Sequence, residues 1–168
     1  MKTLSFIRHG KSSWVDTSLS DIKRPLNKRG LKDSVLMAQQ IRKAGYELKS
    51  VVCSSSNRAL STAKLILDTF SSNNANCDIQ CEVLESLYTF SFEQLRQEIC
   101  QLESSLDDIV IIGHNPAITE YCNFVANAHI VNVPTCGYVR LISDVEDWCY
   151  MNSSNTLLED FLYPKMFK

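Results

Sequence analysis

The sequence has no excess of charge of either sign and no long hydrophobic run. Its 168 residues contain 17 Lys and Arg against 19 Asp and Glu, which gives a net charge of −2. A protein dedicated to nucleic acid or to an anionic membrane needs a strong basic excess, so we expect neither partner. No apolar run approaches the roughly 18 residues of a membrane span, and the N-terminus lacks the features of a signal peptide. We therefore expect a cytoplasmic protein.

Cysteine is frequent, but the paired spacing of a zinc site is missing. Seven Cys residues are scattered along the chain without a Cys-x-x-Cys pair, and Cys77 and Cys81 have no second pair nearby. An odd number of scattered cysteines without an export signal predicts reduced, mostly buried thiols. The sequence also lacks a cluster of Asp and Glu. We therefore expect no metal and no other cofactor.

No repeat, low-complexity tract or linker divides the chain, so the sequence predicts a single domain over residues 1–168. Short apolar runs alternate with helical patterns, which is typical of an α/β three-layer sandwich. In that fold class a mostly parallel central sheet carries helices on both faces. The expected parallel strands cover residues 3–8, 49–53, 78–83 and 108–112. Residues 137–142 and 148–152 are expected to add an antiparallel C-terminal edge.

Polar residues mark the starts of the intervening helices. Asn27 is expected to cap the first helix, and the second begins near residues 55–56. Ser91 starts a predicted capping box for the third helix. Asn115 is expected to cap the fourth helix, which Pro116 opens.

Ligands of open α/β sheets bind outside the carboxyl ends of the parallel strands. Arg8 and His9 follow the first expected strand. Arg58 lies in the opening turn of the helix after the second strand, and His114 follows the fourth. Arginine gives a permanently charged fork that matches phosphate oxygens, and helix N-termini add unpaired N–H groups. Two Arg and two His from distant segments therefore predict a site for a tetrahedral dianion.

Metal-independent phosphoryl transfer fits this set, because the positive charge comes from the side chains themselves. One imidazole would attack phosphorus and form a covalent intermediate, while the other would help to hold the oxyanion. Ser54 and Asn115 lie next to these residues and are further candidates to bind the phosphoryl group. Glu85 follows the third strand, where a capping or surface carboxylate is expected.

Three motifs resemble those of the histidine phosphatase superfamily, also called the phosphoglycerate mutase-like family. The first is Arg-His-Gly at residues 8–10, and the second is Ser-Ser-Ser-Asn-Arg-Ala-Leu-Ser-Thr at residues 54–62. The third is Gly-His-Asn-Pro at residues 113–116. Together with Arg-Pro-Leu at residues 24–26, they are most similar to the SixA-type phosphohistidine phosphatase branch. The resemblance runs from residue 2 to about 127, and three motifs in order, each after a strand, are a specific signal.

The resemblance implies a phosphoglycerate mutase-like fold and a hydrolase of phosphoric monoesters or phosphoramidates. His9 would be the phosphorylated nucleophile, and Arg8, Arg58 and His114 would bind the phosphoryl group. The carbonyl of Gly10 would orient the imidazole of His9. Some members of the family use a carboxylate after the third strand as general acid, and Glu85 is the best-placed candidate for that role in this sequence.

The resemblance also implies a phosphorylated partner. Phosphohistidine on a phosphorelay protein is the expected substrate, and a small phosphate ester metabolite is the alternative. A non-catalytic phosphoprotein-binding module is the alternative of a different class. Residues 86–107, which hold one expected helix, leave little room for the insertions that cover the pocket in larger relatives. We therefore expect an open pocket in a monomeric protein.

Overall fold

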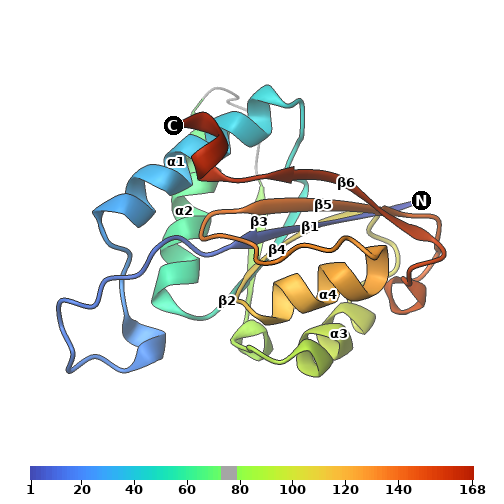
Figure 1. Cartoon of the computed structure of the whole chain (residues 1–168), viewed down its shortest axis with the longest axis horizontal. Coiled ribbons are helices and arrows are strands. Elements are labelled where there is room, and N and C mark those ends of the chain that lie inside the picture. Colours follow the sequence, from blue (N-terminus) through green and yellow to red (C-terminus); the bar gives the residue numbers. More distant parts are fainter. Residues whose placement is uncertain (73–78) are drawn as a thin grey trace.

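A computed structural model describes residues 1–72 and 79–168, and a six-stranded sheet forms its centre (Figure 1). The strand order is β3-β2-β4-β1-β5-β6. The four strands β1 to β4 run parallel, whereas β5 is antiparallel to β1 and β6 to β5. The sheet is therefore mostly parallel with an antiparallel C-terminal edge, as predicted. The strands are β1 (Lys2–Arg8), β2 (Ser50–Ser54), β3 (Gln80–Leu84), β4 (Asp108–Gly113), β5 (Tyr138–Ser143) and β6 (Thr156–Leu162).

Helices cover both faces of the sheet and complete the three layers (Figure 1). One face carries α1 (Lys28–Lys43) and α2 (Asn57–Ser71), and the other carries α3 (Phe92–Cys100) and α4 (Ala117–Ala126). Among the described residues, no helix has both the length and the apolar character needed to cross a bilayer. Within the described residues, short 3-10 helices occupy three connections, namely η1 (Asp21–Lys23), η2 (Glu85–Leu87) and η3 (Trp148–Tyr150), and η4 (Pro164–Phe167) follows β6.

The central strands are apolar on both faces because each face packs on a helical layer. In β4, Ile109 and Ile111 belong to the core under α3 and α4. Val110 and Ile112 point the other way and pack in the core under α1 and α2. A strand buried on both faces has a continuous apolar sequence, which is why β4 was recognisable without alternation.

Three helix starts follow the predicted capping pattern. The side chains of Asn27, Ser56 and Ser91 each accept a hydrogen bond from the backbone N–H three residues further on. Each bond satisfies one of the N–H groups that a first helical turn leaves unpaired. After α1, Gly45 has a φ of 86°, a left-handed conformation that glycine adopts without steric cost. The sequence therefore located these helix ends to within a residue or two.

The predicted cap of the fourth helix is wrong. Pro116 precedes α4, and no side chain caps that helix start. The amide of Asn115 instead donates hydrogen bonds to the Oδ1 of Asn132 at 2.9 Å and to the carbonyl of Val133 at 3.0 Å. Asn115 therefore fastens the loop that follows α4.

The last antiparallel strand also lies elsewhere than predicted. Residues 148–150 form η3, in which the Asp147 carboxylate accepts a hydrogen bond from the backbone N–H of Cys149 at 2.9 Å. Trp148 is buried, and its indole N–H donates to the carbonyl of Glu103 at 3.1 Å. Trp148 and Met151 thus fill the end of a core, whereas Tyr150 is exposed, and the segment does not pair with β5. At the opposite edge, the expected third strand began at Asp78, outside the described residues.

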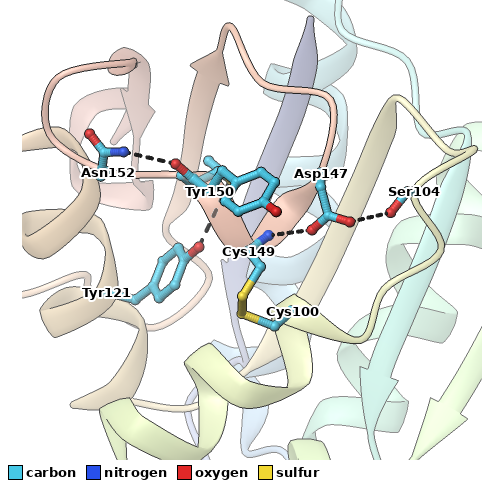
Figure 2. Close-up of a disulfide and its surroundings, with 8 residues drawn as sticks. Cys100, Ser104, Tyr121, Asp147, Cys149, Tyr150 and Asn152 are labelled. Atoms are coloured by element: carbon cyan, nitrogen blue, oxygen red, sulfur yellow. Dashed lines mark hydrogen bonds between the residues drawn. A yellow bond between two sulfur atoms is a disulfide. The ribbon is translucent and has the colours of Figure 1, made fainter.

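A disulfide joins Cys100 at the end of α3 to Cys149 in η3 (Figure 2). The prediction of reduced thiols throughout is therefore wrong for this pair. Spacing alone does not reveal which of seven cysteines will meet in a fold. Cys77 lies outside the described residues. Within the described ranges the free cysteines are Cys53, Cys81, Cys122 and Cys136, and all but the half-buried Cys81 are buried as expected.

Removing this disulfide with Cys149→Ser should lower the free energy of unfolding by about 2–4 kcal/mol. The bond closes a loop between cysteines 49 positions apart, so its loss gives the unfolded chain more conformational freedom. Urea unfolding of the wild type and the variant, each with and without a reductant, measures the effect. The reductant should destabilise only the wild type. Equal stability of oxidised and reduced wild type would contradict the structural role.

Candidate active site

The predicted site residues lie at the carboxyl ends of neighbouring parallel strands in the sheet. In the parallel register of β1 and β4, Arg8 lies opposite Gly113. The segments that follow these two residues therefore leave the sheet side by side. The imidazole rings of His9 and His114 lie with their centroids 5.0 Å apart. Ser54 at the end of β2 reaches the same place, so the predicted convergence is confirmed as geometry.

Both ring nitrogens of His9 are engaged. Nδ1 lies 2.8 Å from the carbonyl of Gly10, as the family resemblance implies, and the Nε of Arg58 donates to Nε2 at 3.2 Å. These partners assign the proton to Nδ1 and a lone pair to Nε2. Burial lowers the pKa of His9 to about 4, and the charges of Arg58 and Arg8 also disfavour protonation. His9 is therefore a neutral imidazole at neutral pH.

The loop that carries His9 is held by close backbone packing. The backbone N–H of Gly10 donates to the Oγ1 of Thr62 at 2.9 Å, which links the first and second motifs. A Cβ at Gly30 would lie 2.3 Å from the carbonyl oxygen of Lys11. Only glycine at position 30 lets α1 approach the loop this closely.

Arg58 is 3% exposed, and it donates two hydrogen bonds to Asp21, a residue that the sequence analysis did not single out. Its Nη1 donates to the backbone carbonyl of Asp21 at 2.6 Å, and its Nη2 donates to the Oδ2 of Asp21 at 2.8 Å. The hydroxyl of Tyr88 donates to the same oxygen at 2.7 Å. Burial would raise the pKa of Asp21, but the hydrogen bonds from Tyr88 and Arg58 and the nearby positive charges outweigh it and lower the pKa. The Asp21 carboxylate is therefore ionised.

His114 is enclosed by aromatic rings. Its ring centroid lies 5.4 Å from that of Tyr88 and 5.2 Å from that of Phe90. Its Nε2 lies 2.7 Å from the buried hydroxyl of Ser54, while its Nδ1 is buried without a hydrogen-bond partner among the described residues. Burial, with smaller effects from neighbouring charges, lowers the pKa of His114 to about 3. His114 is thus also neutral.

Arg8 is held by the loop after α4. Its Nη1 donates to the carbonyl of Val133 at 2.8 Å and to the Oδ1 of Asn132 at 3.4 Å, the same acceptors that Asn115 uses. In the described part of the chain, the Nε of Arg8 and the Oδ1 of Asn115 are buried without partners. Arg8 and Asn115 thus share one anchoring loop beside the two histidines.

Glu85 lies further out than the other predicted residues. It begins η2, and its side chain is exposed. Tyr88, three residues later, and Phe90 are the residues after β3 that contact the cluster. The role of Glu85 as a general acid stays a prediction.

The loop between β1 and α1 contributes residues that no motif marked. It closes through an isolated antiparallel bridge between Ser12 and Leu26, and it brings Asp21 to Arg58. Within it, the guanidinium of Arg24 lies 3.6 Å from the ring centroid of Trp14. The Trp14 side chain is 61% exposed. The available signal for this loop was the Arg-Pro-Leu of residues 24–26, which is SixA-like but gave no role to Asp21.

The site combines two guanidinium groups, two neutral imidazoles and one carboxylate. Such a set can bind a tetrahedral dianion and offer it an unprotonated nitrogen nucleophile. Across residues 1–72 and 79–168, no group of three or more His, Cys, Asp or Glu side chains is placed to hold a metal ion.

The chain is similar to several known proteins. An uncharacterized chloroplastic protein of Arabidopsis thaliana is 26% identical over 151 residues, which span 88% of this chain and 69% of the relative. The structure of the protein histidine phosphatase SixA complexed with tungstate aligns with a TM-score of 0.78 at 20% identity, over 99% of both chains. SixA from Agrobacterium tumefaciens aligns with a TM-score of 0.80 at 19% identity, over 97% of this chain and 98% of its own. These structural likenesses show a shared phosphoglycerate mutase-like fold.

A match to a sequence family shows which superfamily the chain belongs to, which the shared fold alone does not establish. The family model described as Histidine phosphatase superfamily (branch 1) matches residues 4–101, more than half of the chain. This span includes the first two motifs, at residues 8–10 and 54–62, and the third follows it at residues 113–116. The chain belongs to branch 1 of the histidine phosphatase superfamily.

Proposed function

We propose that this protein is a phosphohistidine phosphatase that works through a phosphorylated His9. The phosphatase class comes with the superfamily, whereas the nucleophile, the phosphate ligands and the substrate are proposals. The observation that carries them is the hydrogen bond from the Nε of Arg58 to the Nε2 of His9, in a cluster where the Nε of Arg8 and the Nδ1 of His114 are buried without partners among the described residues. A neutral imidazole nucleophile beside two guanidinium groups and a buried, unpaired imidazole N–H suits attack on a phosphoryl dianion.

The hydrogen bonds of His9 support Nε2 as the attacking atom. The Gly10 carbonyl fixes the proton on Nδ1 and keeps the ring in one orientation. The low pKa leaves the lone pair free across the neutral range. In the structure this lone pair accepts the hydrogen bond from the Nε of Arg58. Once Nε2 is bonded to phosphorus, the Nε–H of Arg58 would donate to a phosphoryl oxygen instead.

The tautomer of His114 supports a role in phosphate binding. The Oγ of Ser54 accepts a hydrogen bond from the backbone N–H of Ser56 at 3.4 Å, so its own proton is free for the Nε2 of His114. A neutral His114 that accepts at Nε2 carries its proton on Nδ1, the atom without a partner. This buried N–H would donate to a phosphoryl oxygen, and Ser54 would act through His114.

The proposed reaction has two steps. In the first, the Nε2–P bond forms while the bond from phosphorus to the leaving group breaks, and the leaving group takes the electron pair. His9 then carries the phosphoryl group on Nε2 and its original proton on Nδ1. In the second, water attacks phosphorus, the Nε2–P bond breaks, and both protons of the water leave with the phosphate. Arg58 and Arg8 would stabilise the charge on the transferring oxygens in both steps.

Two features favour a phosphorylated side chain on another protein as substrate. Residues 88–107, between η2 and β4, contain α3 and short turns, and the connection holds no inserted domain. At the mouth, Phe90 and Trp14 are substantially exposed and offer apolar surface to a partner. The protein histidine phosphatase SixA, which shares this fold, is named for that chemistry.

A comparison of substrates tests the proposal. We expect kcat/KM for a histidine-phosphorylated phosphorelay protein to exceed that for small phosphate esters by at least about tenfold, or about 1.4 kcal/mol in transition-state stabilisation. Release of inorganic phosphate should be measured for both substrate classes with the same enzyme preparation. A clear preference for small esters would replace the phosphohistidine assignment with a metabolite phosphatase.

A further inference from the structure

Asp21 places a negative charge at the mouth of a site otherwise built to bind an anion. Its Oδ2 lies 2.8 Å from the Nη2 of Arg58, and the Nε of the same guanidinium lies 3.2 Å from the Nε2 of His9. The Asp21 side chain is 47% exposed, whereas His9 is 8% exposed. Asp21 therefore lies on the solvent side of Arg58, and the nucleophile lies on the buried side.

An entering substrate must present its phosphoryl group to His9 and leave its remaining atoms toward solvent. In phosphoryl transfer the attacking atom and the leaving atom lie roughly in line on opposite sides of phosphorus. With His9 on the buried side, the leaving group lies on the side where the Asp21 carboxylate is exposed. A carboxylate there disfavours an anionic leaving group and favours one with an N–H or a positive charge.

We propose that Asp21 determines specificity for N-phosphorylated imidazole by accepting the ring N–H of the leaving group. This inference rests on the proposed function and names the residue that would distinguish a phosphoramidate from an ester. The imidazoles of His9 and of the substrate, on opposite sides of the phosphoryl group, would then each donate their ring N–H to an oxygen acceptor of the protein. The Gly10 carbonyl holds the ring proton of His9, and the Asp21 carboxylate would hold that of the substrate.

The transfer balances without any proton passing to Asp21. The substrate ring enters as an imidazolium, with phosphorus on one nitrogen and a proton on the other. As the Nε2–P bond forms on His9, the substrate N–P bond breaks and its electron pair stays on the nitrogen. The substrate leaves as neutral imidazole with its N–H still donated to Asp21, and His9 becomes the phosphorylated imidazolium.

An ionised Asp21 does not fit the opposite role of general acid. The alkoxide of a serine or sugar phosphate needs a proton as it leaves, and a carboxylate held ionised by Tyr88 and Arg58 has none to give. Asp21 also has a positioning contact with Arg58, which would affect every substrate equally. The two roles are therefore separable by comparing leaving groups.

The test is Asp21→Asn assayed on two substrates, a phosphohistidine protein and p-nitrophenyl phosphate. The amide keeps an oxygen for Arg58 but removes the negative charge. We expect kcat/KM for phosphohistidine to fall about tenfold or more, the effect of losing a charge-assisted hydrogen bond. Because p-nitrophenolate leaves without a proton and carries negative charge, its kcat/KM should change only through the contact of Asp21 with Arg58, so the ratio of kcat/KM for phosphohistidine to that for p-nitrophenyl phosphate should fall about tenfold or more.

Asp16→Asn is the matched control, since Asp16 is an exposed carboxylate in the same loop whose hydrogen bonds go to Ser18. Asp21→Ser is the second variant, and circular dichroism with thermal unfolding checks that each variant is folded. An equal fall on both substrates would overturn the proposal and leave Asp21 as a positioning residue for Arg58. No fall on either substrate would overturn it as well. If the wild type itself prefers esters, the proposed function fails, and that result is read from the wild type alone.

Discussion

Replacing His9 with alanine should lower kcat by about 10⁴-fold or more, because no other group can then form the covalent intermediate. His9 is the neutral imidazole whose Nε2 faces the Arg58 guanidinium. Turnover of an aryl phosphate by wild type and His9→Ala measures the loss. Rapid quench with a labelled substrate should trap an acid-labile, base-stable phosphoprotein in the wild type and none in the variant.

His129 provides the matched control for this experiment. It is the third histidine of the chain, its side chain is exposed, and its φ of 53° is a conformation that asparagine tolerates well. His129→Asn should keep wild-type activity. Turnover by His9→Ala at the wild-type rate would show that the nucleophile is misassigned. A wild type that binds phosphoprotein but never releases phosphate would instead favour the non-catalytic binding module.

Replacing Arg58 with alanine should lower kcat/KM by about 10³-fold or more, the lower end of what a phosphate-binding arginine supplies in phosphoryl transfer. Arg58 contacts the Nε2 of His9, the proposed nucleophile, and is held in place through its other two nitrogens by Asp21. Steady-state kinetics should show the loss mainly in kcat, since the charge on the phosphoryl oxygens grows toward the transition state. Inhibition by inorganic phosphate should weaken in parallel.

Arg58→Lys keeps the charge but loses the planar fork, so it should recover only part of the activity. Arg42→Ala changes an exposed arginine at the end of α1 and should leave the kinetics unchanged. Thermal unfolding distinguishes a folded, inactive Arg58 variant from an unfolded one. A folded Arg58→Ala enzyme with near wild-type kcat/KM would remove Arg58 from the proposed mechanism.

The parallel core of the fold was predictable because burial on both faces gives it a strong apolar pattern. The strand at residues 108–112 and the helix capped by Asn27 are examples, each found within one or two residues. The last strand, Thr156–Leu162, was missed because it lies at the sheet edge, where exposed Leu157 and half-exposed polar residues obscure the alternation. The strand was predicted at residues 148–152 instead, where Trp148 is buried in η3 and Tyr150 is exposed.

The site was predictable where a residue directly follows a strand and lies in a motif. His9 and His114 are brought together by the adjacency of β1 and β4. The sequence predicted that both follow parallel strands of one sheet, but not that these two strands are neighbours. Asp21 was missed because it reaches Arg58 through the closure of the loop between Ser12 and Leu26, and this pairing has no local sequence signal. Asn115 was assigned to a helix cap because its position fits one, but its amide N–H groups donate to the loop after α4, and its Oδ1 accepts no hydrogen bond from α4.

The two tryptophans of the chain are natural fluorescent reporters of different regions. Trp148 is buried next to the disulfide-linked Cys149, so its emission follows the integrity of the core. Trp14 is exposed and stacks on Arg24, which lies 3.9 Å from the carboxylate of Asp21. A ligand that binds to Asp21 or Arg24 changes the electrostatic environment of the Trp14 indole. The buried Trp148 remains inaccessible to quenchers in the solvent. Quenching by iodide therefore offers a label-free optical titration of the active-site mouth, with an internal reference in the same molecule.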